Sequence, residues 1–161
     1  MKSLLLALGL IVFLPCQVLA ADIYLVRHAE KQLDVKDPEL TAQGQQRALA
    51  LAELLRQKPV ERIMSSDYRR TRQTAAPLAE QLGQTVEIYN AKDLQALANT
   101  LRERAVTTVV VGHSNTTPEL ALLLGAPDFG EIEEKSEYDR LYVIPLDNPQ
   151  QAELLRFGAG H

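Results

Sequence analysis

The chain has 161 residues, of which 17 are lysine or arginine and 21 are aspartate or glutamate, giving a net charge of −4 at pH 7. This acidic balance argues against nucleic-acid binding, which needs a basic face, but a local group of arginines can still bind a small anion. The single cysteine, Cys16, excludes an internal disulfide, and the length suits one domain with a buried core.

The first twenty residues have the pattern of a secretory signal peptide. Lys2 supplies a short positive region, Leu4 to Leu14 is apolar, and Val18-Leu19-Ala20 offers small residues before a cleavage site. A retained membrane anchor is disfavoured because the apolar run is shorter than the roughly 20 residues that span a bilayer. We therefore expect a signal peptide over 1–20, one domain over 21–161, and a secreted protein, in the bacterial periplasm, with no membrane span after cleavage.

Strand-like and helix-like segments alternate along the rest of the chain, which predicts an α/β layered domain. The expected strands are Ile23 to Val26, Val60 to Met64, Thr85 to Tyr89, Val106 to Val111, Arg140 to Pro145 and Ala152 to Phe157. The expected helices run from Thr41 to about Gln57, from Tyr68 to Leu82, from Asp93 to Arg104, and from near Thr117-Pro118 onward. We expect an α/β/α sandwich of three layers with a mostly parallel central sheet.

Two of these segments carry further information. Val106 to Val111 is β-branched throughout, which is typical of a central strand covered on both faces. Pro77 lies inside the second expected helix, so a kink or an early break is predicted there.

Polar residues follow three of the expected strands. Arg27-His28 comes after the first strand, the turn Ser65-Ser66-Asp67 after the second, and His113 after the strand that ends at Gly112. Open α/β sheets bind ligands at the carboxyl ends of their strands, so these three segments can face one cleft. An arginine brings a permanent positive charge and five N–H donors, which suggests a histidine that works on phosphate.

Each feature also has a plainer interpretation. A single histidine is more often a core or surface residue with a satisfied hydrogen bond, but two in the same structural position favour a function. Arg69, Arg70 and Arg72 can form a solvated charged face of the second helix. However, an arginine in the first helical turn opposes the helix dipole, unless it shares an anionic ligand with the helix N-terminus.

Taken together and in order, these segments resemble the histidine phosphatase superfamily, also called the phosphoglycerate mutase-like family. Arg27-His28-Ala29-Glu30 matches the first hallmark of that family, and Leu40-Thr41-x-x-Gly44 fits the usual opening of its first helix. The segment from Ser65 to Ala75 matches the second hallmark, in a register that makes Arg70 the active-site arginine. Val111-Gly112-His113-Ser114-Asn115 matches the third.

The resemblance implies phosphoryl transfer through a covalent phosphohistidine on His28, followed by attack of water. Arg27, Arg70 and His113 would surround the phosphoryl oxygens, and His113 would help most when protonated, a form that the family's phosphate pocket favours. Ser114 and Asn115 are candidate contacts to a small phosphorylated substrate. No metal and no cofactor are implied, because the arginines take the place of a magnesium ion. No oligomeric state is indicated.

One part of the family's machinery has no clear match. Members usually carry an acidic residue that protonates the leaving group. Asp93 and Glu119 are candidates, but Asp93 is equally a helix N-cap and Glu119 a first-turn partner of the helix dipole. A missing acid would favour good leaving groups, such as those of phosphohistidine or acyl phosphates. The loops Lys31–Glu39 and Phe129–Asp139, which would contact the substrate, contain no decisive motif.

The sequence thus predicts a phosphatase that hydrolyses a phosphomonoester or a similar substrate. Mutase activity is less favoured, because the compact chain lacks the inserts that cap the substrate in the mutases. The alternative from another class is a phosphate- or sugar-phosphate-binding module of the same fold that has no turnover.

Overall fold

Residues 20–158 are described by the computed structural model, so the predicted signal peptide, apart from Ala20, lies outside the described residues, as does His161. The strands are β1 (Asp22–Arg27), β2 (Arg62–Ser66), β3 (Val86–Tyr89), β4 (Thr108–Gly112), β5 (Arg140–Pro145) and β6 (Glu153–Arg156). The helices are α1 (Ala42–Leu55), α2 (Arg69–Leu82), α3 (Leu94–Arg104) and α4 (Thr116–Leu123), with a short 3-10 turn at Pro149–Gln151.

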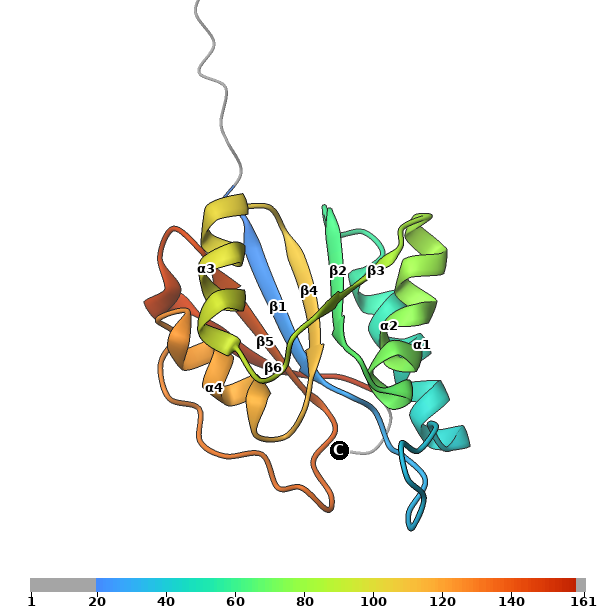
Figure 1. Ribbon diagram of the computed structural model, residues 1–161. Helices are drawn as coiled ribbons and strands as arrows, with labels where there is room; N and C mark the ends of the chain where they lie inside the picture. Colours follow the sequence, from blue (N-terminus) through green and yellow to red (C-terminus); the bar gives the residue numbers. More distant parts are fainter. Residues whose placement is uncertain (1–19, 159–161) are drawn as a thin grey trace, which may run out of the picture.

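The six strands form one sheet in the order β3-β2-β4-β1-β5-β6. The four strands β3, β2, β4 and β1 run parallel, whereas β5 runs antiparallel to β1 and to β6. Helices α1 and α2 cover one face of this sheet, and α3 and α4 cover the other (Figure 1). The predicted three-layer sandwich with a mostly parallel sheet is confirmed.

Alternate side chains of the central strands supply the two halves of the core. In β1, Ile23 and Leu25 pack into the cluster with α3 and α4, whereas Tyr24 and Val26 pack into the cluster with α1 and α2. Every residue of β4 is buried. The continuous β-branched run therefore forms a strand that is covered on both faces, as its composition predicts.

One local prediction was wrong. Ser65 and Ser66 belong to β2 and not to a turn, because their backbones pair with β3 and, at Ser65, with Val111 of β4. Of the two outcomes predicted at Pro77, the early break does not occur, because helix α2 continues through the proline to Leu82. Buried residues lie on both sides of the proline, among them Ala75 and Leu78, so packing offsets the lost backbone hydrogen bond.

The segment after β1 is held by a close contact with α1. The Thr41 hydroxyl caps this helix by accepting a hydrogen bond from the Gly44 amide at 3.1 Å. Gly44 lies so near the backbone of Glu30 that a Cβ atom would be 2.1 Å from the Glu30 carbonyl oxygen. Glycine is needed here because the start of α1 packs directly against the backbone of the residues that follow His28.

Candidate active site

A cavity of about 310 Å³ opens beside the carboxyl ends of β1, β2 and β4. Its lining residues are His28, Lys31, Tyr68, Arg70, Ala91, Lys92, His113, Ser114, Asn115, Thr116 and Glu134. Five of the six predicted site residues are in this set, and Arg27 is not. Parallel pairing explains the meeting of the two histidines, since Arg27 pairs with Gly112 and each is followed by a histidine. The ring centroids of His28 and His113 lie 5.6 Å apart.

The ring of His28 is buried and held in one tautomer. Its Nδ1 atom lies 2.8 Å from the carbonyl oxygen of Ala29, which can only accept, so Nδ1 carries the proton. Nε2 then keeps its lone pair, and within residues 20–158 no hydrogen bond occupies it. Burial, together with the positive charges of Arg27 and Arg70, lowers the pKa of His28 to about 3, although the hydrogen bond to the Ala29 carbonyl acts in the opposite direction. At pH 7 the ring is a neutral base with a free nitrogen.

His113 is held by a chain of hydroxyl groups. Its Nε2 donates to the Ser66 hydroxyl at 2.8 Å, Ser66 donates to the Thr71 hydroxyl at 3.0 Å, and Thr71 donates to backbone carbonyls. On the other side of the ring, the Arg70 guanidinium donates to Nδ1 at 3.3 Å. This arrangement requires the neutral ring with its proton on Nε2.

The expected protonated form of His113 is therefore not the form that this structure favours at pH 7. Burial, together with the positive charges of Arg70 and Arg27, lowers the pKa of His113 to about 4. A phosphoryl anion next to the ring would raise the pKa again, because an opposite charge favours the imidazolium. Protonation of His113 thus depends on the substrate.

Arg70 brings a partly unused set of donors to the cavity. Besides its contact with His113, its guanidinium stacks on the Tyr68 ring at 4.5 Å and lies 3.9 Å from the Asp37 carboxylate. Its Nε is buried and has no hydrogen-bond partner among the described residues. An anion in the cavity would supply acceptors for this side chain.

The neighbouring arginines of α2 do not line the cavity. Arg69 forms an ion pair with Glu39 at 2.8 Å, and Arg72 pairs with Asp67. Both side chains are largely exposed, so the plainer interpretation as a charged helix face is the right one for these two residues.

Arg27 is not in the lining of the cavity. Arg27 is buried, with 2% of its surface exposed. Its guanidinium donates hydrogen bonds to the backbone carbonyls of Glu133 at 3.3 Å, Glu134 at 2.7 Å and Glu137 at 2.8 Å. It also lies 4.1 Å from the centre of the Tyr138 ring. Arg27 thus fastens the loop before β5 to the end of β1, and its predicted role as a phosphate ligand stays a prediction.

The two candidate acids are not in the cavity lining. Asp93 caps α3 by accepting a hydrogen bond from the Ala96 amide at 3.0 Å. Glu119 lies in the first turn of α4. In both cases the structural interpretation accounts for the residue.

Sequence reasoning did not single out six residues that line the cavity, namely Lys31, Tyr68, Ala91, Lys92, Thr116 and Glu134. Lys31 and Glu134 do belong to the two loops that were expected to contact the substrate. Lys92 follows β3, so the rule that ligands lie at strand ends could have included it. Glu134 precedes an antiparallel strand, and that rule does not find it. The two lysines give this part of an acidic protein a positive lining together with Arg70.

Within residues 20–158, no three histidine, cysteine, aspartate or glutamate side chains are grouped so that they could hold a metal ion. None of the helices in the same range is long and apolar enough to cross a bilayer.

Comparison with known proteins points to one family. Residues 23–97 match the model described as Histidine phosphatase superfamily (branch 1). "Probable phosphoglycerate mutase GpmB" from Citrobacter koseri is 31% identical over 105 residues, which cover 61% of this chain and 48% of that protein. The chain therefore spans about half the length of the curated relatives it matches.

Solved structures share the fold over most of the chain. The mycobacterial glucosyl-3-phosphoglycerate phosphatase has a TM-score of 0.64 at 18% identity, covering 88% of this chain and 100% of that one. The protein histidine phosphatase SixA, in complex with tungstate, has a TM-score of 0.65 at 17% identity, covering 84% and 95%.

Proposed function

We propose that this chain belongs to the histidine phosphatase superfamily and hydrolyses a phosphomonoester or a similar phosphorylated substrate through a phosphohistidine on His28. The observation that carries the proposal is the state of His28. Its ring is neutral, its Nδ1 is tied to a backbone carbonyl, and its free Nε2 shares a cavity with Arg70 and His113.

In the first step, the Nε2 lone pair of His28 attacks phosphorus while the bond from phosphorus to the leaving-group oxygen breaks. Arg70 neutralises charge that spreads over the phosphoryl oxygens, and His113 adds a second donor once the bound anion has favoured its protonation. In the second step, water attacks phosphorus, the P–N bond breaks, and inorganic phosphate is released. The carbonyl of Ala29 stabilises the ring in both steps because it holds the Nδ1 proton.

Hydrolysis of p-nitrophenyl phosphate tests this proposal. Replacing His28 by alanine removes the nucleophile, so His28→Ala should lower kcat/KM by at least about 10³-fold. Arg69→Ala is a matched control, since it removes a charge from the same end of the sheet but outside the cavity, and should retain activity. Intact-mass analysis after an alkaline quench should detect phosphate on wild type and not on His28→Ala.

If wild type and His28→Ala are equally inactive on aryl phosphates while inorganic phosphate still binds, the chain is a binding module and the enzyme proposal fails. Phosphate attached covalently to His28 would instead eliminate the binding-only alternative.

We also propose that the protein is a small secreted member of the family, cleaved after Ala20 and located in a bacterial periplasm. The pattern of residues 1–20 supports this. The position of β1 is compatible with it, because the strand begins at Asp22 and Ala21 already accepts a hydrogen bond from the Leu146 amide at 2.9 Å. N-terminal sequencing of the protein from a periplasmic extract tests it, and a retained Met1 would contradict cleavage.

A further inference from the structure

Glu134 is the one acidic residue in the lining of the active-site cavity among the residues that the structure describes. We propose that Glu134 is the catalytic acid and base of this chain, which protonates the leaving-group oxygen and later takes a proton from the attacking water. This inference rests on the proposed function and supplies the group for which neither Asp93 nor Glu119 is suitably placed.

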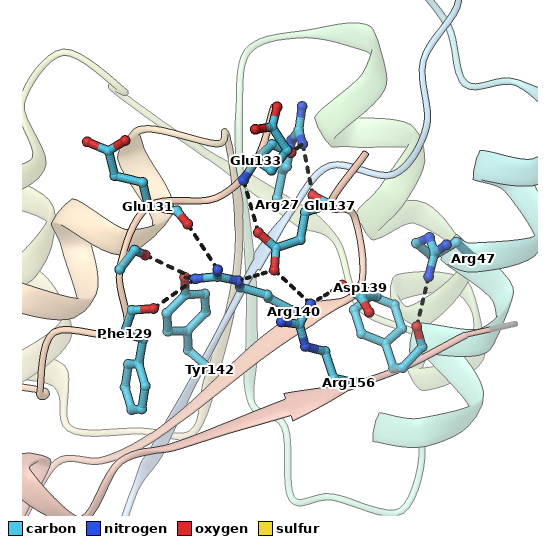
Figure 2. A network of polar contacts seen from close by, with 12 residues as sticks. Arg27, Arg47, Phe129, Glu131, Glu133, Glu137, Asp139, Arg140, Tyr142 and Arg156 are labelled. Atoms are coloured by element: carbon cyan, nitrogen blue, oxygen red, sulfur yellow. Dashed lines mark hydrogen bonds and ion pairs between the residues drawn. The ribbon is translucent and has the colours of Figure 1, made fainter. Parts of the chain in front are cut away.

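The turn that carries Glu134 is tied together at its ends. The Glu137 amide donates to the Glu133 carbonyl at 2.9 Å, and the Glu133 amide donates back to the Glu137 carboxylate at 2.9 Å. Figure 2 shows the same carboxylate between two arginines, Arg140 and Arg156, each 2.7 Å away. Burial alone would raise the pKa of Glu137, but hydrogen bonds from Arg140, the Glu133 amide and Arg156 lower it to about 2.

This turn is also fastened to the nucleophile's own strand. The Arg27 guanidinium donates hydrogen bonds to three carbonyls of the turn, including that of Glu134 at 2.7 Å. Arg27 immediately precedes His28 in the chain. The position of Glu134 relative to His28 is thus held by the buried Arg27 side chain. General acid catalysis needs this kind of fixed placement, because the proton must be within hydrogen-bond reach of the departing oxygen.

The surroundings of Glu134 indicate where the leaving group lies. Glu134, Ser114 and Asn115 line both the active-site cavity and an adjoining hollow of about 470 Å³. Because the attacking and leaving atoms are roughly in line across phosphorus, the leaving group lies away from His28. The junction of the two hollows is such a place, and Glu134 is beside it.

The proton transfers balance over one turnover. As His28 Nε2 forms its bond to phosphorus, the P–O bond to the leaving group breaks and the Glu134 carboxyl gives its proton to that oxygen. Water then attacks phosphorus, one water proton passes to the Glu134 carboxylate, and the P–N bond breaks.

The test compares leaving groups of different acidity. Glu134→Gln keeps the size and hydrogen-bonding capacity of the side chain but removes the acid. For an alkyl phosphate such as glycerol phosphate, its kcat/KM should fall about 10²–10⁴-fold, the usual contribution of a general acid. For p-nitrophenyl phosphate the fall should be less than about tenfold, because this leaving group departs without a proton. Asp128→Asn, in the same loop but outside the linings of both hollows, should leave both rates unchanged.

Glu134→Gln rates that fall equally for both substrates, or for neither, would overturn the assignment of Glu134 while leaving the phosphohistidine proposal intact. The proposed function is tested separately by turnover of p-nitrophenyl phosphate and by phosphate on His28. A wild-type protein that turns over no aryl phosphate would remove both the proposed function and the role of Glu134.

Discussion

At the scale of single residues, the chemistry of the site depends on which nitrogen of each histidine carries a proton. His28 keeps its proton on Nδ1 because the Ala29 carbonyl accepts it, and His113 keeps its proton on Nε2 because Ser66 accepts it. Each ring therefore has a defined tautomer before any ligand binds. A main-chain carbonyl and a serine hydroxyl determine these tautomers.

These environments predict the titration of both rings. With pKa values of about 3 for His28 and about 4 for His113, neither imidazole should gain a proton between about pH 5.5 and pH 8. Added inorganic phosphate should raise the pKa of His113, because it brings an opposite charge. Nitrogen-15 NMR of the imidazole rings measures both effects, with His28→Asn to assign the signals. A ring that titrates near its ordinary pKa in the free protein would contradict the buried environment described here.

At the scale of elements, the loop between α4 and β5 is the part that completes the site. It contributes no strand or helix, yet three of its carbonyls accept hydrogen bonds from Arg27 and its Glu134 lines the cavity. In Figure 1 this orange segment lies at the end of the sheet where β1 and β4 finish. Antiparallel pairing of β5 with β1 brings it there, since an antiparallel strand begins where its parallel neighbours end.

The close contact between α1 and the segment after β1 also predicts an effect on the stability of the protein. In Gly44→Ala the new Cβ would lie 2.1 Å from the Glu30 carbonyl oxygen, so the helix start or the segment after His28 must move. We expect a loss of about 1–3 kcal/mol in the free energy of unfolding, as for other overpacked sites. Urea unfolding measures it, with the exposed neighbour Gln45→Ala as the control. Equal stability of Gly44→Ala and wild type would show that this contact is loose.

At the scale of the whole molecule, groups with lowered pKa values make the fold sensitive to acid. The pKa of His28 is about 3 in the folded protein against 6.5 ordinarily, and that of Glu137 is about 2 against 4.5. In both intervals the unfolded chain binds more protons than the folded protein. The folded state therefore loses stability as pH falls, from 6.5 towards 3 through His28 and from 4.5 towards 2 through Glu137.

The expected result is a free energy of unfolding that decreases below about pH 6.5, by up to about 1.4 kcal/mol per pH unit for each such group. Urea unfolding at several pH values measures the slope. His28→Asn should flatten it between about pH 6 and pH 4, because asparagine takes up no proton there. A wild-type protein as stable at about pH 5 as at pH 7 would contradict this account.

Much of this architecture is predictable from local pattern. The six strands and four helices follow from apolar periodicity, from the Thr41 cap and from Gly83, which ends α2 in a left-handed conformation. Errors arose where neighbours override local signals. Ser65 and Ser66 look like a turn in isolation, but the parallel strands beside them hold them in β2.

For the site, the sequence by itself determined that His28, Arg70 and His113 meet, because each follows a strand of a parallel sheet and such strands end at one edge. Only the tertiary structure decided the ionisation of the histidines and the contacts of Arg27 with the loop before β5. Both depend on residues that are far apart in the chain. The tertiary structure also decided that Glu134 lines the cavity, because the antiparallel direction of β5 and its pairing with β1 set where the preceding loop lies.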